Sequence, residues 1–456
     1  MGRMLNMADV WEALGSGLIA SRTGPATAFA RGIIDSRNTQ AGDIFFALRG
    51  ENADGHDFLP QALQSGASAA VVERPVPATD ASLFHVTDSL RALQRLAAYW
   101  RFRHDLRVIG VTGSVGKTTA KELIAHVLSR RFRVLKSEAN INTEIGIPLT
   151  LLQLGEEHQR AVLEMAMYSR GEVALLAEIA RPVVGVVTNV GPVHLERLGY
   201  MGAIIAAKAE LVEALPTDGL AVLNGDDSRT AAFARRTHAR ALLFGTSPQC
   251  DFRATDIQSH GLGGIEFHMS TPSGEAAVRC PLPGRHHVYA ALAAAAVALN
   301  EGMSLDEFTS ALSEARPDLR LTPRPGPNGS LIIDDSYNAS PASMLAALDL
   351  LSECPGRRIA VLGDMRELGA ASDAGHLAVG RHTVGRCDVL IVVGGDARLI
   401  EEGARAGAHP YLRSVASADE ATALLRRELR TGDHVLIKAS RAVGLESVVD
   451  ALVTAR

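Results

Sequence analysis

Short apolar runs separated by stretches of helical periodicity dominate the chain between about residues 106 and 316. Such runs are typical of strands buried on both faces, and strands that alternate with helices form parallel sheets. We therefore predict a mainly parallel, doubly wound sheet. The later stretch FRATDIQSHGLGGIEFHMS alternates around glycines and predicts an antiparallel hairpin added to this sheet. The predicted parallel strands are RVIGVT, RAVLEMAM, PVVGVVTNV and LAVLNGD, at residues 107–112, 160–167, 182–190 and 220–226.

The two flanking parts of the chain show the same kinds of pattern. Residues 32–50 give two short β-rich runs around a Gln-Ala-Gly-Asp turn, and residues 56–73 predict a helix, a glycine stop and a strand. The proline-rich stretch 316–330 predicts a hinge. Beyond it, the strand-like runs LIIDDS, RIAVLGDM, DVLIVVGG and HVLIKAS alternate with helices.

These patterns predict an α/β protein of three domains. A central P-loop-type parallel-sheet domain, residues 106–316, is flanked by a small N-terminal α/β domain, residues 1–105, and by a Rossmann-like C-terminal α/β domain, residues 317–456. The length of 456 residues agrees with this number, since a domain holds roughly 150 residues.

Composition excludes several classes of protein. A net charge of −5 argues against general affinity for nucleic acid or anionic lipid, which require a basic surface. The 4 cysteines form no CxxC pair, so neither a disulfide framework nor a zinc site is indicated. The first residues lack a basic start followed by a continuous apolar core, so we expect no signal peptide. The apolar stretch VYAALAAAAVAL is too short to cross a bilayer and predicts a buried helix. We expect a cytoplasmic monomer that does not insert stably into membranes.

A glycine-rich loop interrupts the apolar pattern between residues 108 and 128, VIGVTGSVGKTTAKELIAHVL. Gly113 and Gly116 allow the backbone amides to turn inward, the following helix N-terminus adds partial positive charge, and Lys117 adds a full charge. Thr118 offers a hydroxyl to a magnesium ion that accompanies phosphates. An ordinary glycine-rich turn is the alternative, and Val111 stands where the full P-loop pattern has its first glycine. The lysine and threonine after a buried strand favour phosphate binding, by Gly113, Ser114, Val115, Gly116, Lys117, Thr118 and Thr119.

Further polar residues follow the predicted strands of the central block. Glu164 ends one strand, Asn189 and His194 follow the next, and Lys208 and Glu210 lie on a helix soon afterwards. The carboxyl ends of parallel strands are where such sheets bind ligands. Each residue alone has another interpretation: a solvated strand end, a loop histidine with its own hydrogen bonds, or a surface lysine. Their order as a set favours a site.

These residues, in this order, resemble the motifs of the Mur ligases. Mur ligases are ATP-dependent enzymes that add amino acids to the UDP-linked precursor of bacterial peptidoglycan. The similar stretches cover nearly the whole chain: DSRNTQAGDIFFALRGENADGHDF, TGSVGKTT, NINTEIGIPLTLL, EMAM, TNVGPVHLE, AKAE, IIDDSYNASPASM, LGDMRELG and KASRAVGLE. Asp-Ser-Tyr-Asn-Ala and Gly-Asp-Met-x-Glu-Leu-Gly are characteristic of the branch that adds D-alanyl-D-alanine. The Asp-Asn-Pro-Arg signature of the diaminopimelate-adding branch is absent.

The resemblance implies a ligase that uses ATP and Mg²⁺ to join D-alanyl-D-alanine to UDP-N-acetylmuramoyl-tripeptide through an acyl phosphate, with release of ADP and phosphate. Three alternatives stay open at this point. A related ligase would add a single amino acid, a P-loop small-molecule kinase would stop at a phosphorylated product, and a ligase-like module would bind nucleotide without turnover.

The resemblance also implies roles for individual residues of the central block. Lys117 would hold the phosphates, and Thr118 with Glu164 would hold one magnesium ion. His194 with Lys208 would hold a second, after CO2 has added to the neutral Lys208 amine to form a carbamate, an oxygen ligand that suits magnesium.

The same resemblance assigns residues outside the phosphate loop. Ser36 and Arg37 match the uridine-nucleotide region, and Asn142 and Thr143 lie in a stretch assigned to the substrate. Three residues of the third block are assigned to ATP: Arg320 to the phosphates, Asp335 to the ribose hydroxyls, and Asn338 close by. LIIDD also matches the magnesium-binding strand end of an ordinary P-loop ATPase, but its position beyond the predicted hinge favours the ribose. Lys438, Ser440 and Arg441 form either a solvated loop or a wall near the incoming dipeptide.

The chain departs from the family pattern at several positions. Ala166 and Ala439 replace glycines. His287 and Ala290 replace two asparagines near the adenine, so the motif GRHHVYAALAAA does not itself predict how the base is recognised. His286 is kept as a candidate.

Overall fold

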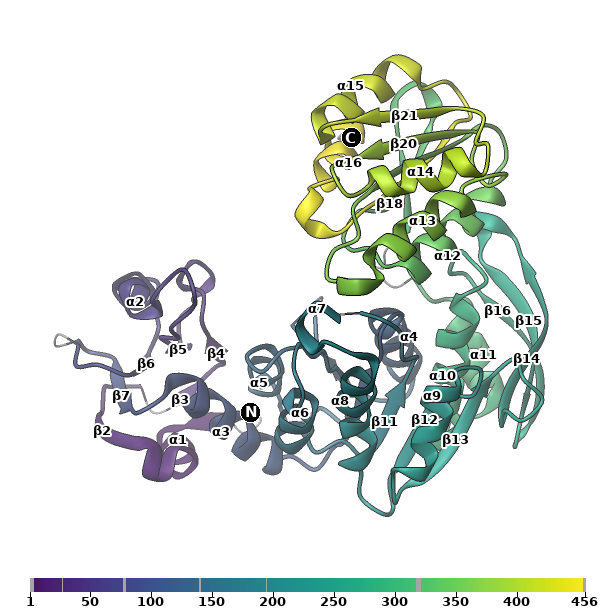
Figure 1. Cartoon of the computed structure of the whole chain (residues 1–456). Coiled ribbons are helices and arrows are strands. Elements are labelled where there is room, and N and C mark those ends of the chain that lie inside the picture. Colours follow the sequence, from purple (N-terminus) through teal and green to yellow (C-terminus); the bar gives the residue numbers. More distant parts are fainter. Residues whose placement is uncertain are drawn as a thin grey trace.

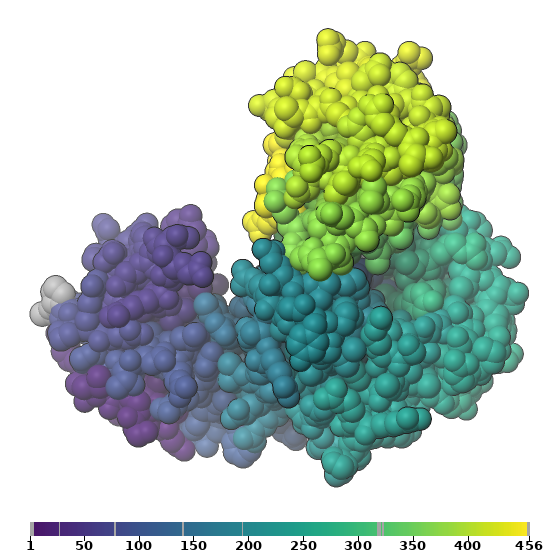
Figure 2. All heavy atoms as spheres, in the orientation of Figure 1, coloured from purple at the N-terminus to yellow at the C-terminus, as the bar shows by residue number. Residues whose placement is uncertain are grey.

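The computed structural model describes residues 4–26, 28–76, 79–138, 141–193, 195–316 and 321–453. Three larger sheets follow one another along the chain, and each forms its own lobe (Figure 1). We call these the N-terminal, central and C-terminal lobes. The central lobe lies between the other two, and Figure 2 shows an open notch above it that separates the N-terminal lobe from the C-terminal lobe.

The N-terminal lobe is a small α/β unit, as predicted. Its five-stranded sheet has the order β2-β7-β6-β5-β4, with only the β2–β7 pair antiparallel, and β1 pairs with β3 beside it. The predicted runs around the Gln-Ala-Gly-Asp turn are β4 and β5, and the predicted helix and strand are α2 and β6. The elements are β1 (Leu5–Asn6), α1 (Met7–Leu14), β2 (Leu18–Arg22), β3 (Ala28–Phe29), β4 (Gly32–Ile33), β5 (Ile44–Phe46), α2 (Leu59–Gln64), β6 (Ala69–Val72), β7 (Ser82–Val86) and α3 (Ser89–Phe102).

The central lobe contains the predicted parallel sheet, extended by an antiparallel hairpin. Its nine strands have the order β16-β15-β14-β13-β12-β11-β8-β10-β9, and those from β14 to β9 run parallel. The four predicted strands are β8, β10, β11 and β12, and the predicted hairpin is β14 with β15. The strands are β8 (Arg107–Thr112), β9 (Val134–Lys136), β10 (Arg160–Glu164), β11 (Val184–Val187), β12 (Leu220–Asn224), β13 (Arg240–Gly245), β14 (Phe252–Ser259), β15 (Ile265–Thr271) and β16 (Gly274–Cys280).

Helices cover both faces of the central sheet, which explains why its strands are apolar throughout. One apolar core contains α4 and α10 residues with one strand face, and another contains α6 and α8 residues with the opposite face. The helix predicted from the alanine-rich stretch is α10, which is buried on nearly all sides. The helices are α4 (Lys117–Leu128), α5 (Gly146–Leu151), α6 (Glu172–Ala180), α7 (Leu195–Leu198), α8 (Met201–Glu213), α9 (Ser228–Ala231), α10 (His287–Asn300) and α11 (Leu305–Ser313).

The C-terminal lobe is a six-stranded sheet of order β17-β18-β22-β19-β20-β21. The four predicted strands are β18, β19, β20 and β22. The predicted hinge is partly wrong, because its residues Thr322–Pro325 form the edge strand β17, antiparallel to β18. An edge position tolerates prolines, which cannot donate a ladder hydrogen bond. The elements are β17 (Thr322–Pro325), β18 (Leu331–Asp335), α12 (Pro341–Ser352), β19 (Arg358–Gly363), α13 (Ser372–His382), β20 (Val389–Val393), α14 (Arg398–Ala406), β21 (Leu412–Val415), α15 (Ala418–Glu428), β22 (His434–Lys438) and α16 (Glu446–Leu452).

Two structural facts bear on the expectations from composition. Across the described ranges, no helix combines the length and the apolar character that a membrane crossing requires. The cysteines Cys250, Cys280, Cys354 and Cys387 are free thiols, and all are buried.

The packing of α4 predicts the stability of a core variant. Ile124 is 0% exposed and belongs to the core that α4 shares with α10. We expect Ile124→Ala to lower the free energy of unfolding by about 2–5 kcal/mol, because the truncation leaves a cavity. Ile19→Ala, at a position 57% exposed, is the control and should change it by no more than about 0.5 kcal/mol. Urea denaturation checks both values, and equal effects would contradict the predicted packing.

Candidate nucleotide site

The glycine-rich loop connects β8 to α4 at the carboxyl edge of the central sheet. Gly113 and Gly116 have φ angles of 146° and 82°, in the region that favours glycine. A Cβ on Gly113 would lie 2.0 Å from Thr188 Oγ1, so this glycine is also required by close packing. Val111 is a fully buried strand residue that pairs with β10 and β11. The loop therefore begins only at Gly113, which explains why the longer P-loop pattern does not apply.

Residues after β11 hold the loop in place. The Asn189 side chain receives a hydrogen bond from Val115 N and donates one to Val115 O, each at 2.9 Å. Thr188 Oγ1 donates to the same carbonyl at 2.7 Å, and Ser114 N donates to Asn189 O at 2.9 Å. Asn189 therefore lies at the predicted strand end, but its side chain supports the loop.

The N-terminus of α4 is suited to bind an anion. In the described structure no side chain caps this helix, whose first residues are Lys117, Thr118 and Thr119. The first amides of a helix have no partner within the helix, and the helix dipole favours negative charge there. Lys117 Nζ donates to Ser114 O at 3.4 Å, so its charge lies over the loop. This arrangement suits an anion, and phosphate binding by the loop stays a prediction.

A carboxylate and a hydroxyl lie side by side next to this helix end. Glu164 at the end of β10 accepts hydrogen bonds from Thr118 Oγ1 at 2.8 Å and from Asn142 Nδ2 at 2.9 Å. Its backbone amide donates to Ser137 Oγ at 3.0 Å. Glu164 is 2% exposed, so the interpretation as a solvated strand end is wrong.

Lys208 reaches the same place from α8. Its side chain is 2% exposed and donates to Gly113 O at 2.8 Å, so the alternative of a surface lysine is wrong. Burial lowers the pKa of Lys208 well below its ordinary value, the nearby Lys117 charge lowers it further, and Glu164 opposes this shift. A lowered pKa favours the neutral amine. Glu210 has a different role, because its carboxylate accepts from two amides at the start of α6, at 2.8 and 3.0 Å.

The oxygen atoms of Thr118 and Glu164 fit one magnesium ion. Carboxylate and hydroxyl oxygens are the ligands that this hard cation prefers, and the hydrogen bond between the two side chains holds them together. His194, predicted for a second ion, lies outside the described residues. Within the described part of the chain, no group of three or more His, Cys, Asp or Glu side chains is placed to hold a metal.

A cavity of about 660 Å³ extends from the loop to the C-terminal lobe. Ser114, Val115, Gly116 and Thr119 line one end. The C-terminal lobe contributes residues of α12 and also Leu321, Asp335 and Lys438. The cavity is therefore built by two lobes.

Two predicted residues of the C-terminal lobe meet at Lys438. Asp335 lies 2.6 Å from Lys438 Nζ, which also donates to Asn338 O at 2.8 Å. Asp335 belongs to β18, in a different sheet from the phosphate loop, as the ribose interpretation requires. Lys438 and Ser440 are 1% and 4% exposed, so the solvated-loop interpretation is wrong for both. Arg441 is exposed, and Arg320 lies outside the described residues.

The residues predicted to bind the UDP substrate make local contacts. Ser36 Oγ donates to Gln61 Oε1 at 2.7 Å. The exposed Arg37 side chain pairs with Asp35 at 2.7 Å, and this hydrogen bond lowers the pKa of Asp35. Near the central loop, Thr143 Oγ1 accepts from Gly146 N at 3.3 Å and supports the start of α5. Substrate binding by Ser36, Arg37, Asn142 and Thr143 stays a prediction.

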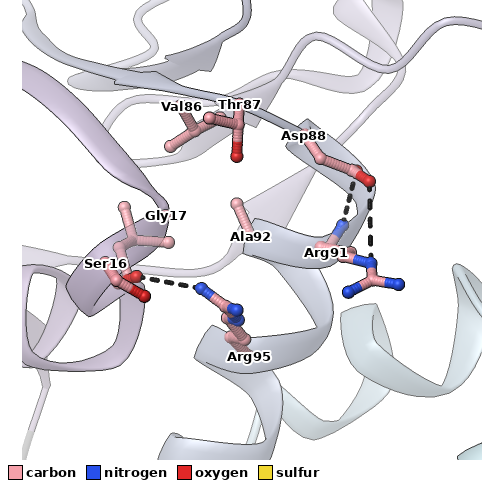
Figure 3. Close-up of a pocket in the computed structure, with 9 residues that line it drawn as sticks. Ser16, Gly17, Val86, Thr87, Asp88, Arg91, Ala92 and Arg95 are labelled. Carbon is pink, nitrogen blue, oxygen red and sulfur yellow. Dashed lines mark hydrogen bonds and ion pairs between the residues drawn. The ribbon is translucent and has the colours of Figure 1, made fainter.

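A smaller pocket of about 140 Å³ lies in the N-terminal lobe (Figure 3). Arg91 N donates to Asp88 Oδ1 at 2.9 Å, and Arg95 Nη1 donates to Leu14 O at 3.3 Å. Ser16 and Gly17 face these arginines across the pocket. It contains none of the predicted site residues.

The buried Lys121 supports the strand end that carries Glu164, a role that the sequence did not predict. Lys121 is 0% exposed and donates to Ser137 O at 2.5 Å, while Ser137 Oγ accepts from the Glu164 amide. The available signal was the position of Lys121, four residues after Lys117 and within the apolar stripe of its helix. Thr188 gave no such signal, since its role depends on contact with Gly113.

Three family models match successive parts of the chain. They are the Mur ligase family catalytic domain at residues 33–101, the Mur ligase middle domain at residues 111–298, and the Mur ligase glutamate ligase domain at residues 319–441. Among curated proteins, the UDP-N-acetylmuramoyl-tripeptide–D-alanyl-D-alanine ligase of Synechocystis is 41% identical, with 92% of this chain and 90% of that protein covered. The ligase of the same name from Escherichia coli K12 is 37% identical, with 92% of each covered.

Solved structures agree with this similarity. MurF from Acinetobacter baumannii matches with a TM-score of 0.89 at 33% identity over 99% of both chains. MurF ligase from Thermotoga maritima in complex with ADP matches with a TM-score of 0.81 at 30% identity, over 92% of this chain and 96% of that one. A UDP-N-acetylmuramoyl-L-alanyl-D-glutamate–2,6-diaminopimelate ligase, at 19% identity and a TM-score of 0.54, shares the fold.

The two loop glycines differ in their surroundings, which predicts different effects of an alanine. Gly116→Ala places its Cβ in open space and should lower the free energy of unfolding by about 1–2 kcal/mol, from backbone strain alone. Gly113→Ala adds the clash with Thr188 and should lower it by about 3 kcal/mol or more, with weaker binding of a triphosphate. Denaturation and calorimetric titration measure both. A Gly113→Ala variant no worse than Gly116→Ala would contradict the packing.

Proposed function

The chain belongs to the Mur ligase family, and from that membership and its nucleotide cavity we propose that it joins D-alanyl-D-alanine to UDP-N-acetylmuramoyl-tripeptide with ATP. The observation that supports this proposal most directly is that the phosphate loop, the Thr118–Glu164 pair and the buried Lys208 lie together at one edge of the sheet. Relatives between 32% and 41% identical that bear this enzyme's name support the choice of substrates.

The chemistry follows from the weakness of a carboxylate as an acyl donor. The γ-phosphoryl group moves from ATP to the terminal carboxylate of the tripeptide, which gives an acyl phosphate and ADP. The D-alanyl-D-alanine amine then attacks the acyl carbon, the bond to the phosphate oxygen breaks, and the amine loses its proton as phosphate leaves. Lys117 and the amides of α4 position the phosphates and offset their charge, which is the main requirement of phosphoryl transfer.

Magnesium is proposed to bind at Thr118 and Glu164, where it supplies positive charge that offsets the charge of the phosphate oxygens. Lys208 is proposed to carry a carbamate. Its burial and the nearby Lys117 charge support this proposal, because both favour the neutral amine that reacts with CO2. His194 and Arg320 keep the roles that the family resemblance gives them, as proposals.

The proposed domains are residues 1–105, 106–316 and 317–456. The first domain is proposed to bind the UDP substrate, and the third is proposed to close over the nucleotide and to bind the incoming dipeptide. We propose a cytoplasmic monomer that acts in peptidoglycan precursor synthesis. A related ligase that adds one amino acid is the principal alternative, and a small-molecule kinase is the other.

A ligation assay separates these functions. The assay supplies ATP, Mg²⁺ and UDP-N-acetylmuramoyl-tripeptide with either D-alanyl-D-alanine or a single amino acid. We expect mass spectrometry to show a joined product only with D-alanyl-D-alanine, because a single amino acid is too small to fill a site that fits a dipeptide. A chelator should abolish the product and added Mg²⁺ should restore it. Joining of a single amino acid instead would contradict the proposal, as would ADP formation with a phosphorylated end product.

Three lysine variants test the site. Lys117→Ala removes a positive charge from beside the phosphates, and Lys208→Ala removes the proposed carbamate ligand of magnesium. Each variant should therefore slow ligation about 10²–10³-fold. Native mass spectrometry should find Lys208 heavier by one CO2 in the unaltered protein.

Lys136→Ala is the matched control. Lys136 lies on β9, is 45% exposed and pairs with Glu122, so we expect its rate to stay within about twofold of the unaltered protein. Normal ligation by Lys117→Ala would exclude the proposed phosphate site.

A further inference from the structure

The charged side chain of Lys121 on α4 is completely buried, at 0% exposure. Lys121 lies one helical turn after Lys117 but does not line the nucleotide cavity, so it is not a phosphate contact of the kind proposed for Lys117. Its Nζ atom lies 2.7 Å from Glu122 Oε1 and donates to Ser137 O at 2.5 Å. Lys121 therefore acts within the protein interior, and Ser137 is its contact beyond its own helix.

The ion pair between Lys121 and Glu122 does not by itself explain why a lysine is buried here. Removing two charges from water costs free energy that their attraction offsets only in part, so an apolar pair of similar size is often equally stable. Glu122 also has a second partner, since Lys136 Nζ lies 2.5 Å from its Oε2. The buried lysine is better explained by the segment that it holds in place.

Ser137 connects Lys121 to the end of β10. The pairing of β9 with β10 ends at Lys136 and Val162, and the Ser137 amide donates to Val162 O at 3.1 Å. Glu164 lies two residues beyond this pairing, and its amide donates to Ser137 Oγ at 3.0 Å. Ser137 is fully buried. Because Lys121 holds its carbonyl group and its hydroxyl holds the strand end, a shift of Ser137 would also shift the Glu164 backbone.

The same connection fixes the two proposed magnesium ligands relative to each other. Thr118 and Lys121 lie three residues apart and therefore on the same side of α4. Thr118 Oγ1 donates to Glu164 Oε2 at 2.8 Å, and Lys121 holds the residue that binds the Glu164 amide. Helix α4 thus holds Glu164 at two points, the carboxylate directly and the backbone through Ser137.

We propose that Lys121 is a positioning residue for magnesium: through Ser137 it holds the end of β10 where the Glu164 carboxylate faces Thr118. The proposal rests on the magnesium site of the proposed function and adds a residue that does not touch the metal. Removing a group that orients a metal ligand typically lowers metal affinity about 10–100-fold. Loss of Lys121 should therefore weaken binding of the metal more than binding of the nucleotide alone.

Calorimetric titration with a non-hydrolysable ATP analogue, either with Mg²⁺ or with a chelator, tests the proposal. The ratio of the two dissociation constants measures how much the metal contributes to binding. Lys121→Met keeps most of the side-chain length and removes the charge, and we expect this ratio to fall about tenfold. Binding without metal should stay within about twofold of the unaltered protein, because the phosphate loop and Lys117 are unchanged.

Lys136→Ala is the matched control, since it removes the other lysine that pairs with Glu122 and leaves the bond from Lys121 to Ser137. It should keep the ratio within about twofold of the unaltered protein. Ser137→Ala removes the hydroxyl that accepts from the Glu164 amide, and it should lower the ratio as Lys121→Met does. Combining these two changes should lower the ratio little further, because both break the same connection.

Three results would overturn the proposal. Equal weakening with and without metal would mean that Lys121 serves only general packing. Effects of Lys121→Met and Ser137→Ala that multiply in the combined variant would mean that Lys121 does not act through Ser137. If Lys121→Met fails to fold because Glu122 stays charged, adding Glu122→Gln removes that charge, and an unchanged ratio in this double variant would equally contradict the proposal.

Metal positioning and ligation can fail separately. Suppose that Mg²⁺ strengthens nucleotide binding to the unaltered protein and does so less in Lys121→Met, but no dipeptide is joined; this result would contradict only the proposed function. Ligation of D-alanyl-D-alanine by the unaltered protein, together with an unchanged ratio in Lys121→Met, would overturn only the role of Lys121.

Discussion

The close approach of Gly113 to Thr188 is the constraint on which the site depends. It brings the end of β8 against the residues that follow β11, leaving room for no side chain at Gly113. Val115 is then bonded on both its amide and carbonyl sides by residues after β11. The loop is thus fixed by the residues that follow a neighbouring strand, and Gly116 and Thr119 at the start of α4 line the cavity. Such preorganisation is what phosphoryl transfer requires, because positioned charge needs no rearrangement during the reaction.

Several charged side chains are buried around this loop, and each is held in position by its neighbours. Glu164 is held by Thr118 and Asn142, and its amide by Ser137, which in turn receives Lys121. Lys208 approaches the loop carbonyl from the opposite helix. Burial of an unpaired charge is costly, so each group here has a partner or a lowered tendency to ionise. A site that gathers phosphates and an anionic substrate benefits from this closely spaced set.

The C-terminal lobe completes the cavity from a separate sheet. Its Asp335–Lys438 pair and the start of α12 face the phosphate loop across the space where the nucleotide would lie. His287 in the first turn of α10 lines this cavity, and α10 also packs against α4 in the core of the central lobe. The α10 wall of the cavity and the phosphate loop at the start of α4 are therefore connected through one helix pair.

The sequence alone determined the features that are local along the chain: the buried strands, the glycine turn, the helix after it, and the order of Lys117, Glu164 and Lys208. Each follows from periodicity or from the chemistry of adjacent residues, and the family resemblance added their roles. Only the tertiary structure decided that Asn189 and Thr188 support the loop, that Thr322–Pro325 forms an edge strand, and that Lys121 supports the strand end that carries Glu164. These outcomes depend on contacts between separate segments of the chain, and no local pattern specifies such contacts.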